Sequence, residues 1–340
     1  MTLTRRAGLR GALAAITAAT IGISAPASAA EEANYLLATA STGGTYYPVG
    51  VAIATLTKVK LQPKQKIGMS AINSAGSGQN VQLLRQNEAQ FAILQGLYGF
   101  YAATGTGPVA EPQDNLRSVS MLWQNVEQFI VAEGAASTGD VSDLLAMEGQ
   151  TLALGRQNSG TIGSNKHLMS GLGVDIESAY ELFYAGYGPS AEALQNGQVT
   201  GISTPAGVPT GAITKLMAAA GGSVALLDFT DEQLAAADQG SGLWTRYVIP
   251  AKTYPNQDED WNTIAQPNFL AANADVPEEH VYQITKTMYE NLPFLQAIHP
   301  ATKAMAIEKA IVGLPLPLHP GAARYYAEVG VELPERLVAQ

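Results

Sequence analysis

The stretch Tyr35-Leu36-Leu37-Ala38-Thr39-Ala40 forms a short apolar run, and Ser41-Thr42-Gly43-Gly44-Thr45 follows it directly. A helical pattern then extends over residues 46–58. An apolar run bounded by turn residues is typical of a buried strand. A strand that leads through a short loop into a helix is the repeating unit of α/β proteins. The folded part of the chain is therefore expected to begin with a βα unit.

The same order of elements continues from this unit. We expect a strand at 67–72, a loop at 73–78, a helix at 79–87 and a strand at 91–94. These alternating patterns predict α/β architecture with parallel strands. A long loop then separates this series from a second one.

Extended segments at 116–123 and 128–132 are expected to make the first crossing into a second lobe. The second series again alternates strands and helices. We expect strands at 151–154, 182–184, 199–203 and 223–227, and helices at 141–147, 161–171, 190–196 and 209–220. Residues 244–250 are expected to be extended and to return the chain to the first lobe. One helix is predicted over 277–297, and a final helix from Pro320.

Composition favours two packed lobes. The chain has 340 residues, which is enough for two cores of ordinary size. Hydrophobic residues make up 46% and charged residues 14%, a balance that argues against a disordered chain. There is no cysteine, so disulfides and thiolate metal ligands are excluded.

The N-terminal segment has the pattern of an export signal. Arg5, Arg6 and Arg10 precede a largely apolar run at 12–23, and Ala27-Ser28-Ala29 is a small-residue cleavage pattern. The apolar run is shorter than the roughly 20 residues that span a bilayer. We expect residues 1–29 to be a cleaved signal peptide and the mature protein to be periplasmic. The paired arginines leave twin-arginine export open beside general secretion.

Charge argues against two classes of partner. The net charge is −10, and removing three signal arginines leaves 16 basic against 29 acidic residues, or −13. An acidic surface disfavours binding to nucleic acid and to anionic membranes. It does not disfavour a small anionic ligand, which responds to the local field of its pocket.

Three loops combine glycine with hydroxyl-bearing residues between a strand and a helix, at 41–46, 73–78 and 158–161. In open α/β sheets, ligands bind beyond the carboxyl ends of the strands, where such loops meet helix N-termini. Free amides and the helix dipole favour an anion there. Simple N-capping by serine and threonine is the alternative for any one loop.

Motifs of several enzyme classes are missing from the sequence. It contains neither of the glycine-rich nucleotide-binding motifs and no serine-hydrolase elbow. The histidines His167, His280, His299 and His319 have no metal-ligand spacing. We therefore expect no metal, no cofactor and no catalytic residue.

Two cations lie near the third loop. Arg156 precedes it, and Lys166 lies about one turn into the following helix. Either could pair with a carboxylate on a ligand, but a surface charge is the favoured interpretation for each, since most lysines and arginines are exposed.

The chain resembles the TAXI family, the solute receptors of one class of TRAP transporters. The resemblance lies in Gly43-Gly44-Thr45-Tyr46-Tyr47-Pro48-Val49-Gly50 and in Asn73-Ser74-Ala75-Gly76-Ser77. It continues in Gly155 with Asn158-Ser159-Gly160-Thr161, and in Leu318-His319-Pro320-Gly321-Ala322. The sequence departs from the family at Leu122-Trp123-Gln124-Asn125-Val126, and at Lys166, where an arginine is commoner.

The resemblance implies a type II periplasmic-binding-protein fold, with two α/β lobes joined by crossing strands and a ligand cleft between them. We expect residues 30–122 and 245–340 in the first lobe and 123–244 in the second. Known ligands of the family are small carboxylates such as glutamate, glutamine and 2-oxo acids. The implied partner is a TRAP membrane permease driven by an ion gradient, and a monomer is expected.

The candidate ligand-binding residues come from both lobes. They are Ser41, Thr42, Gly44, Thr45, Tyr46, Ser74, Gly76, Ser77, Gln95, Ser159, Gly160, Thr161, Thr204 and Gly207, with Arg156 and Lys166 as possible counter-charges. Tyr46 or Tyr47 could pack on the ligand or in the core. Two other functions stay open: a sensor that docks on a signalling receptor, and an exported enzyme that would use a residue such as Ser77 or His319.

Overall fold

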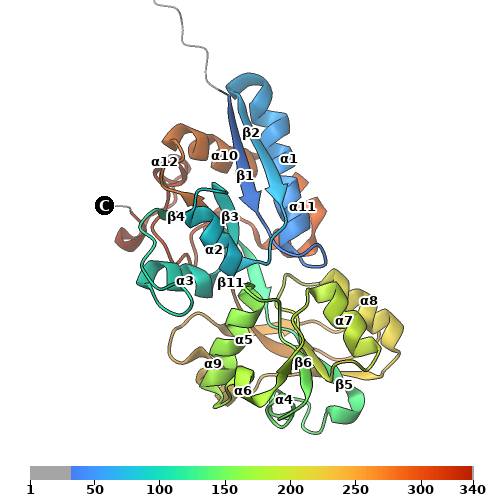
Figure 1. Ribbon diagram of the computed structural model, residues 1–340. Coiled ribbons are helices and arrows are strands. Elements are labelled where there is room, and N and C mark those ends of the chain that lie inside the picture. The colour runs from blue at the N-terminus through green and yellow to red at the C-terminus, as the bar shows by residue number, and fades with distance from the viewer. Residues whose placement is uncertain (1–31, 339–340) are drawn as a thin grey trace, which may run out of the picture. The chain divides into compact units, whose positions relative to one another are not determined.

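The computed structural model describes residues 32–338 and contains two β-sheets, each flanked by helices (Figure 1). The expected mixed α/β architecture with two lobes is confirmed. The predicted signal peptide, 1–29, lies outside the described residues. Within residues 32–338, no helix combines the length and the apolar character needed to cross a bilayer.

The first lobe is built around the six-stranded sheet. Its strands are β1 (Ala33–Ala38), β2 (Ile67–Ile72), β3 (Phe91–Gln95), β4 (Leu116–Val126), β10 (Thr245–Ile249) and β11 (Trp261–Asn273). Its helices are α1 (Tyr46–Gln65), α2 (Ser77–Arg85), α3 (Gly96–Thr104), α10 (Glu278–Glu290), α11 (Leu292–Ile298) and α12 (Pro320–Glu328), with 3-10 turns at Pro300–Ala304, Ile307–Lys309 and Glu335–Leu337.

The second lobe is built around the five-stranded sheet. Its strands are β5 (Phe129–Ala132), β6 (Thr151–Ala153), β7 (Glu181–Leu182), β8 (Gly201–Ser203) and β9 (Val224–Leu227). Its helices are α4 (Ser142–Leu145), α5 (Gly160–Gly171), α6 (Ile176–Ala179), α7 (Tyr187–Gln195), α8 (Gly211–Ala220) and α9 (Asp231–Asp238), with a 3-10 turn at Glu133–Ala135.

The two sheets share one plan. In the first, β1 lies between β2 and β3, all parallel, and β11 adds to β3 in the antiparallel sense. In the second, β6 lies between β7 and β8, all parallel, and β5 adds to β8 in the antiparallel sense. The loops at the carboxyl ends of the parallel strands lead into helices in both sheets, which is the arrangement that positions the site.

The return to the first lobe differs from the expectation. Residues 245–249 are extended as predicted, but they pair only with the start of β11. Strand β11 makes the crossing itself (Figure 1). Its residues 265–273 pair with β4 from one end of β4 to the other. Pro267 lies inside β11, and the register with β4 shifts between Asn268 and Phe269 and again between Leu270 and Ala271. This long strand was not predicted, because proline interrupts a strand pattern.

The predicted helix at 277–297 is two helices. α10 ends at Glu290 and α11 begins at Leu292, with Asn291 between them at φ −125° and ψ 28°. Pro293 occupies the first turn of α11. Proline favours that position and restricts the residue before it, so a new helix begins rather than the old one continuing. Helices α3, α6 and α9 were not predicted.

Side chains of the second sheet alternate between two cores. Phe129 and Val131 pack into one core, while Ile130 between them packs into the other. This alternation is the period-two pattern of a strand covered on both faces. The lobe boundaries stay a prediction. Ile249 and Trp261 pack in a core of the second lobe, so the packing favours a return to the first lobe near Ala265 rather than at residue 245.

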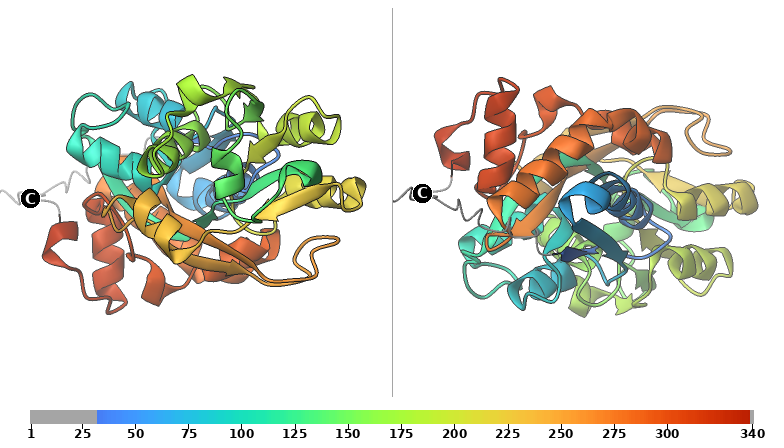
Figure 2. Two further views of the ribbon diagram at one scale, coloured as in Figure 1. Left: turned by 90° about the horizontal axis from the view of Figure 1, so that it is seen from below. Right: turned by 90° about the horizontal axis from the view of Figure 1, so that it is seen from above.

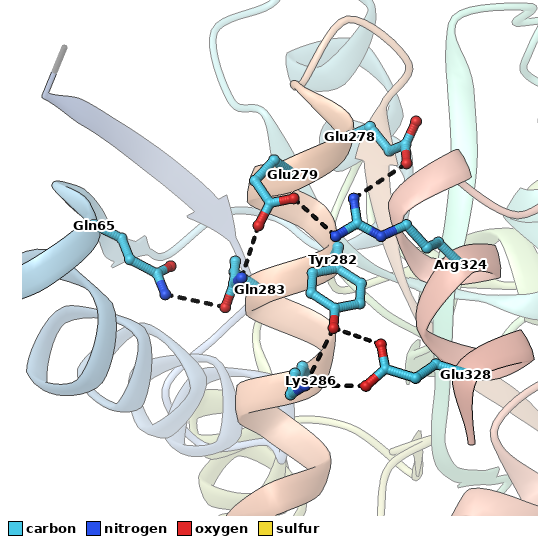
Figure 3. A network of polar contacts seen from close by, with 8 residues as sticks. All are labelled: Gln65, Glu278, Glu279, Tyr282, Gln283, Lys286, Arg324 and Glu328. Atoms are coloured by element: carbon cyan, nitrogen blue, oxygen red, sulfur yellow. Dashed lines mark hydrogen bonds and ion pairs between the residues drawn. The ribbon is translucent and has the colours of Figure 1, made fainter. Parts of the chain in front are cut away.

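A surface network joins two C-terminal helices of the first lobe (Figure 3). Arg324 of α12 lies 3.8 Å from the centre of the Tyr282 ring and forms ion pairs with Glu278 and Glu279 of α10. Lys286 of α10 pairs with a glutamate of α12 at 3.1 Å. α10 and α12 lie side by side in the view from above (Figure 2). Because these groups are solvent-exposed, we assign the network to helix registration rather than to ligand binding.

Candidate functional site

A hollow lies where the loops that follow the six parallel strands meet. It encloses about 480 Å³ between protein atoms, part of which is open to solvent. The first lobe contributes Ala40, Ser41 and 44–46 after β1, 75–77 after β2, and Gln95 at the end of β3. The second lobe contributes Arg156 and 159–161 after β6, 185–187 after β7, and 205–206 after β8. Asn125 of the crossing strand β4 completes the lining.

Five helices begin at this hollow. The first residues of α1, α2, α5 and α7, and the residue before α3, all line it. The first turn of an α-helix leaves amide groups without carbonyl partners and carries the positive end of the helix dipole. Among the N-cap residues, only Ser159 of α5 caps its own helix, where it accepts from the Ile162 amide. In α3 the Leu97 amide donates to Gln266 Oε1 at 2.8 Å, and the other amides of these first turns include donors that no side chain caps. The hollow therefore offers a converging set of amide donors suited to an anion.

One cation lies at the same place. Arg156 lines the hollow and is exposed at its edge. Within residues 32–338, no Asp or Glu belongs to the lining. The formal charge at the hollow is therefore positive in a protein that is acidic as a whole.

Hydroxyl groups around the hollow bind protein carbonyls across the lobes and within them. Thr45 Oγ1 donates to the Gly207 carbonyl at 3.0 Å, which joins the first lobe to the second. Tyr187 OH donates to the Pro205 carbonyl and is within 2.9 Å of Thr161 Oγ1. Burial raises the pKa of Tyr187 far above its ordinary value, so this hydroxyl keeps its proton.

The lobes also contact each other through backbone beside the hollow. The amide of Gln79 donates to the carbonyl of Asn158 at 2.9 Å. Asn158 has a left-handed backbone, with φ 58°, which turns this carbonyl toward α2. A Cβ on Gly78 would lie 2.6 Å from the same oxygen, so the approach requires glycine there. Tyr98 OH adds a bond to the Ser159 carbonyl at 3.3 Å.

A buried polar cluster lies behind the hollow. Gln95 Nε2 and Gln266 Nε2 both donate to Ser164 Oγ, at 2.9 and 3.1 Å. Glu127 is fully buried and accepts from Trp244 Nε1 at 3.1 Å. Burial raises the pKa of the Glu127 carboxyl to about 7, although hydrogen bonds from Trp244, Gln266 and Ser164 oppose the rise.

Most of the residues selected from the sequence lie together. The hollow is lined by Ser41, Gly44, Thr45, Tyr46, Gly76, Ser77, Gln95, Arg156, Ser159, Gly160 and Thr161. Tyr46 also serves the core, because its hydroxyl bonds Asn268 and its ring packs edge-on against Trp123 at 5.9 Å. Tyr47 does not line the hollow. The candidate residues stay a prediction as far as binding is concerned.

Several selected residues lie elsewhere. Ser74 is turned inward, where it bonds Asn80 and the Thr39 carbonyl. Thr204 and Gly207 are outside the lining, and Gly207 instead receives the bond from Thr45. Thr42 borders a separate hollow near α8. Lys166 lines a separate hollow, where it forms an ion pair with Glu177 at 2.8 Å.

Sequence reasoning missed part of the lining. The loop before α7, with Gly186 and Tyr187, follows a strand and contains glycine, so the rule used for the other loops could have found it. Ala40 carries no polar signal, whereas Ala75, Pro205 and Ala206 lie within the segments 74–77 and 204–209 that were expected to face the ligand. Asn125 lies within a strand, and no local pattern distinguishes it from its neighbours.

The histidines have structural contacts. His299 and His319 each accept the amide of the residue two positions later, at 3.1 and 3.2 Å, as helix caps. His280 Nδ1 bonds Tyr35 OH, and His167 stacks on Trp244 at 5.0 Å. No cluster of three metal-ligating side chains occurs among residues 32–338.

Comparison with known proteins places the chain in a family. Residues 37–330 match the NMT1-like family along most of the chain. The chain belongs to the NMT1-like family. The resemblance to the TAXI family is more specific than this family and stays a prediction.

Solved structures share the fold of this NMT1-like protein. MatC from Rhodopseudomonas palustris, solved with bound malate, is 16% identical, with 87% of this chain and 98% of that chain covered and a TM-score of 0.55. A protein of Bordetella bronchiseptica RB50 is 13% identical over 89% of this chain and 86% of that chain, with a TM-score of 0.51. The periplasmic binding protein BugD is 16% identical over 88% and 94%, also at 0.51. The two-lobed type II binding fold is thus confirmed.

Proposed function

We propose that this protein is an exported receptor that captures a small carboxylate or amino acid between its lobes and delivers it to a membrane transporter. The observation that carries the proposal is the convergence of five helix N-termini and Arg156 on one hollow lined from both lobes. Amides and one guanidinium, without a carboxylate in the lining, suit an anionic group of a few atoms. No step of catalysis is proposed, because the lining contains no activated nucleophile with a neighbouring base.

The finer parts of the proposal follow the resemblance to the TAXI family. We infer a ligand of the glutamate, glutamine or 2-oxo acid class and a TRAP permease as the partner. Cleavage near Ala29 would release the mature protein into the periplasm. The bound malate of MatC is a small carboxylate on the same fold and is compatible with this class.

Closure would couple the ligand to the partner. The lobes meet through Thr45, Gln79 and Tyr98 beside the hollow. A ligand stabilises the closed arrangement only by binding it better than an open one. The permease would then recognise surfaces of both lobes in that arrangement.

Calorimetric titration of the purified, ligand-free protein with a panel of two- to six-carbon carboxylates and amino acids tests the proposal. We expect at least one to bind, and we expect Arg156→Ala to weaken that binding by about tenfold through loss of a charge-assisted hydrogen bond. Arg85→Ala is the matched control, because Arg85 is exposed in the last turn of α2, away from the hollow. A folded, ligand-free protein that binds no member of the panel would overturn the proposal.

A further inference from the structure

Two amide side chains of the hollow carry the inference, and the first is Gln95. It is 2% exposed, and its Nε2 donates to the Gly160 carbonyl at 3.0 Å and to Ser164 Oγ at 2.9 Å. A carbonyl oxygen can only accept, so the amide must turn its nitrogen toward Gly160. Gln95 Oε1 is consequently the atom left for another partner. It accepts only a long bond, 3.4 Å, from Asn125 Nδ2.

The second amide is that of Asn125. Its nitrogen faces Gln95 Oε1, so its own oxygen remains as an acceptor. Asn125 is 2% exposed, and its Oδ1 has no hydrogen-bond partner among residues 32–338. A buried acceptor without a donor destabilises a folded protein, so native proteins rarely leave one unless a ligand or water supplies the hydrogen.

No hydroxyl group of the lining, those of Ser41, Ser77 and Thr161 included, is within hydrogen-bond distance of Asn125 Oδ1. Each of four hydroxyl groups of the lining already donates to a protein oxygen: Thr45 to Gly207, Tyr46 to Asn268, Ser159 to Arg156 and Tyr187 to Pro205. Ser164 accepts from two glutamines, which leaves its hydrogen for the Glu127 carboxylate beside it. This side of the hollow therefore presents oxygen acceptors, whereas the helix N-termini present amide donors.

From this division we propose that Gln95 and Asn125 select, among small carboxylates, those that also carry a hydrogen-bond donor, an ammonium or a hydroxyl group. The carboxylate would meet the helix N-termini and Arg156, and the donor would meet the two amide oxygens. A 2-oxo acid or an unsubstituted acid of the same length leaves these oxygens unpaired and binds more weakly. The inference rests on the proposed function and narrows its ligand class.

Two matched ligand sets test the selection by calorimetric titration of the wild-type protein. The five-carbon set is L-glutamate, 2-hydroxyglutarate, 2-oxoglutarate and glutarate, and the four-carbon set is L-aspartate, L-malate and succinate. We expect the amino or hydroxy member to bind about tenfold or more tightly than the oxo and unsubstituted members, as one unpaired buried acceptor implies. The ratio of the affinities for the amino and the hydroxy members shows whether the site prefers an ammonium or a hydroxyl group as the donor.

Variants connect the selection to the residues. Asn125→Leu keeps the side-chain volume but removes the acceptor. The ratio of the affinities for donor-bearing and donor-free ligands should therefore fall toward one. Asn125→Asp keeps an acceptor in the same place and should retain the preference for the ammonium member. Gln82→Leu, on the exposed side of α2, is the control and should leave the ratio unchanged.

The experiments distinguish a failure of the proposed selection from a failure of the receptor function. Equal affinity for donor-bearing and donor-free members, or a preference that survives in folded Asn125→Leu, would overturn the selection while the carboxylate receptor stands. If no member of either set binds and the wider panel also fails, the receptor function itself is overturned together with the selection.

Discussion

Glu127→Gln is expected to raise the free energy of unfolding by about 3 kcal/mol at pH 8 and by about 1 kcal/mol or less at pH 5. Glu127 is fully buried, and burial is the main cause that raises its pKa to about 7 from an ordinary value of 4.5. Between these two values the folded protein holds a proton that the unfolded chain has released. Stability therefore falls as the pH rises from 4.5 to 7 and levels off above 7.

The magnitude follows from the same two values. The difference between the two pKa values means that ionising Glu127 costs about 3 kcal/mol more free energy in the folded protein than in the unfolded chain. Glutamine keeps an oxygen for the Trp244 Nε1 bond and carries no charge at any pH. Urea unfolding followed by circular dichroism at pH 5, 6, 7 and 8 measures the difference. Glu192→Gln, exposed on α7, is the control, and a Glu127→Gln protein with the wild-type pH slope would contradict the prediction.

Gly78→Ala is expected to weaken ligand binding by about 10- to 100-fold without lowering the melting temperature of the ligand-free protein. The new Cβ would lie 2.6 Å from the Asn158 carbonyl of the other lobe, which is backbone and cannot turn aside cheaply. Separation of the lobes relieves the clash, so the closed state becomes rarer and the apparent affinity falls with its population. Alanine inside α2 favours the helix over glycine, so the first lobe itself is not destabilised.

The matched control for this prediction is Gly188→Ala. Gly188 is also a helical glycine, in α7, but a Cβ there meets no atom within 4 Å. Calorimetry with the best ligand of the panel measures affinity, and small-angle X-ray scattering measures whether the variant is more open. A Gly78→Ala protein that binds as tightly as Gly188→Ala would show that the Asn158 contact is not needed for closure.

The βα units could be predicted because each is a local pattern. Apolar runs, glycine-bearing loops and helical periodicity lie within a few residues of one another, so the loops around Thr45, Ser77 and Gly160 were found from sequence and lie together at the hollow. The crossing strand β11 was not found, because Pro267 breaks its pattern and its partners β3 and β4 are distant in sequence.

The chemistry of the hollow was only partly predictable. Hydroxyl groups suggested donors for a ligand, but those of Thr45 and Tyr187 are engaged by carbonyls across or within the lobes. Arg156 and Lys166 could not be told apart, because the direction of each side chain depends on the local backbone, that of the loop before α5 for Arg156 and that of α5 itself for Lys166. The position of Asn125 at the hollow follows only from the tertiary structure, so local sequence could not predict it.

The position of β11 between β3 and β4 has a consequence for the order in which the chain can fold. All of β1 to β9 leaves the ribosome before this strand, yet it supplies the antiparallel neighbour of β3 and sends Trp261 and Ile264 into second-lobe cores. A nascent chain that ends before residue 261 therefore exposes the edge of β3 and lacks part of both cores. Neither lobe is a self-sufficient folding unit, and the two should unfold in a single cooperative transition.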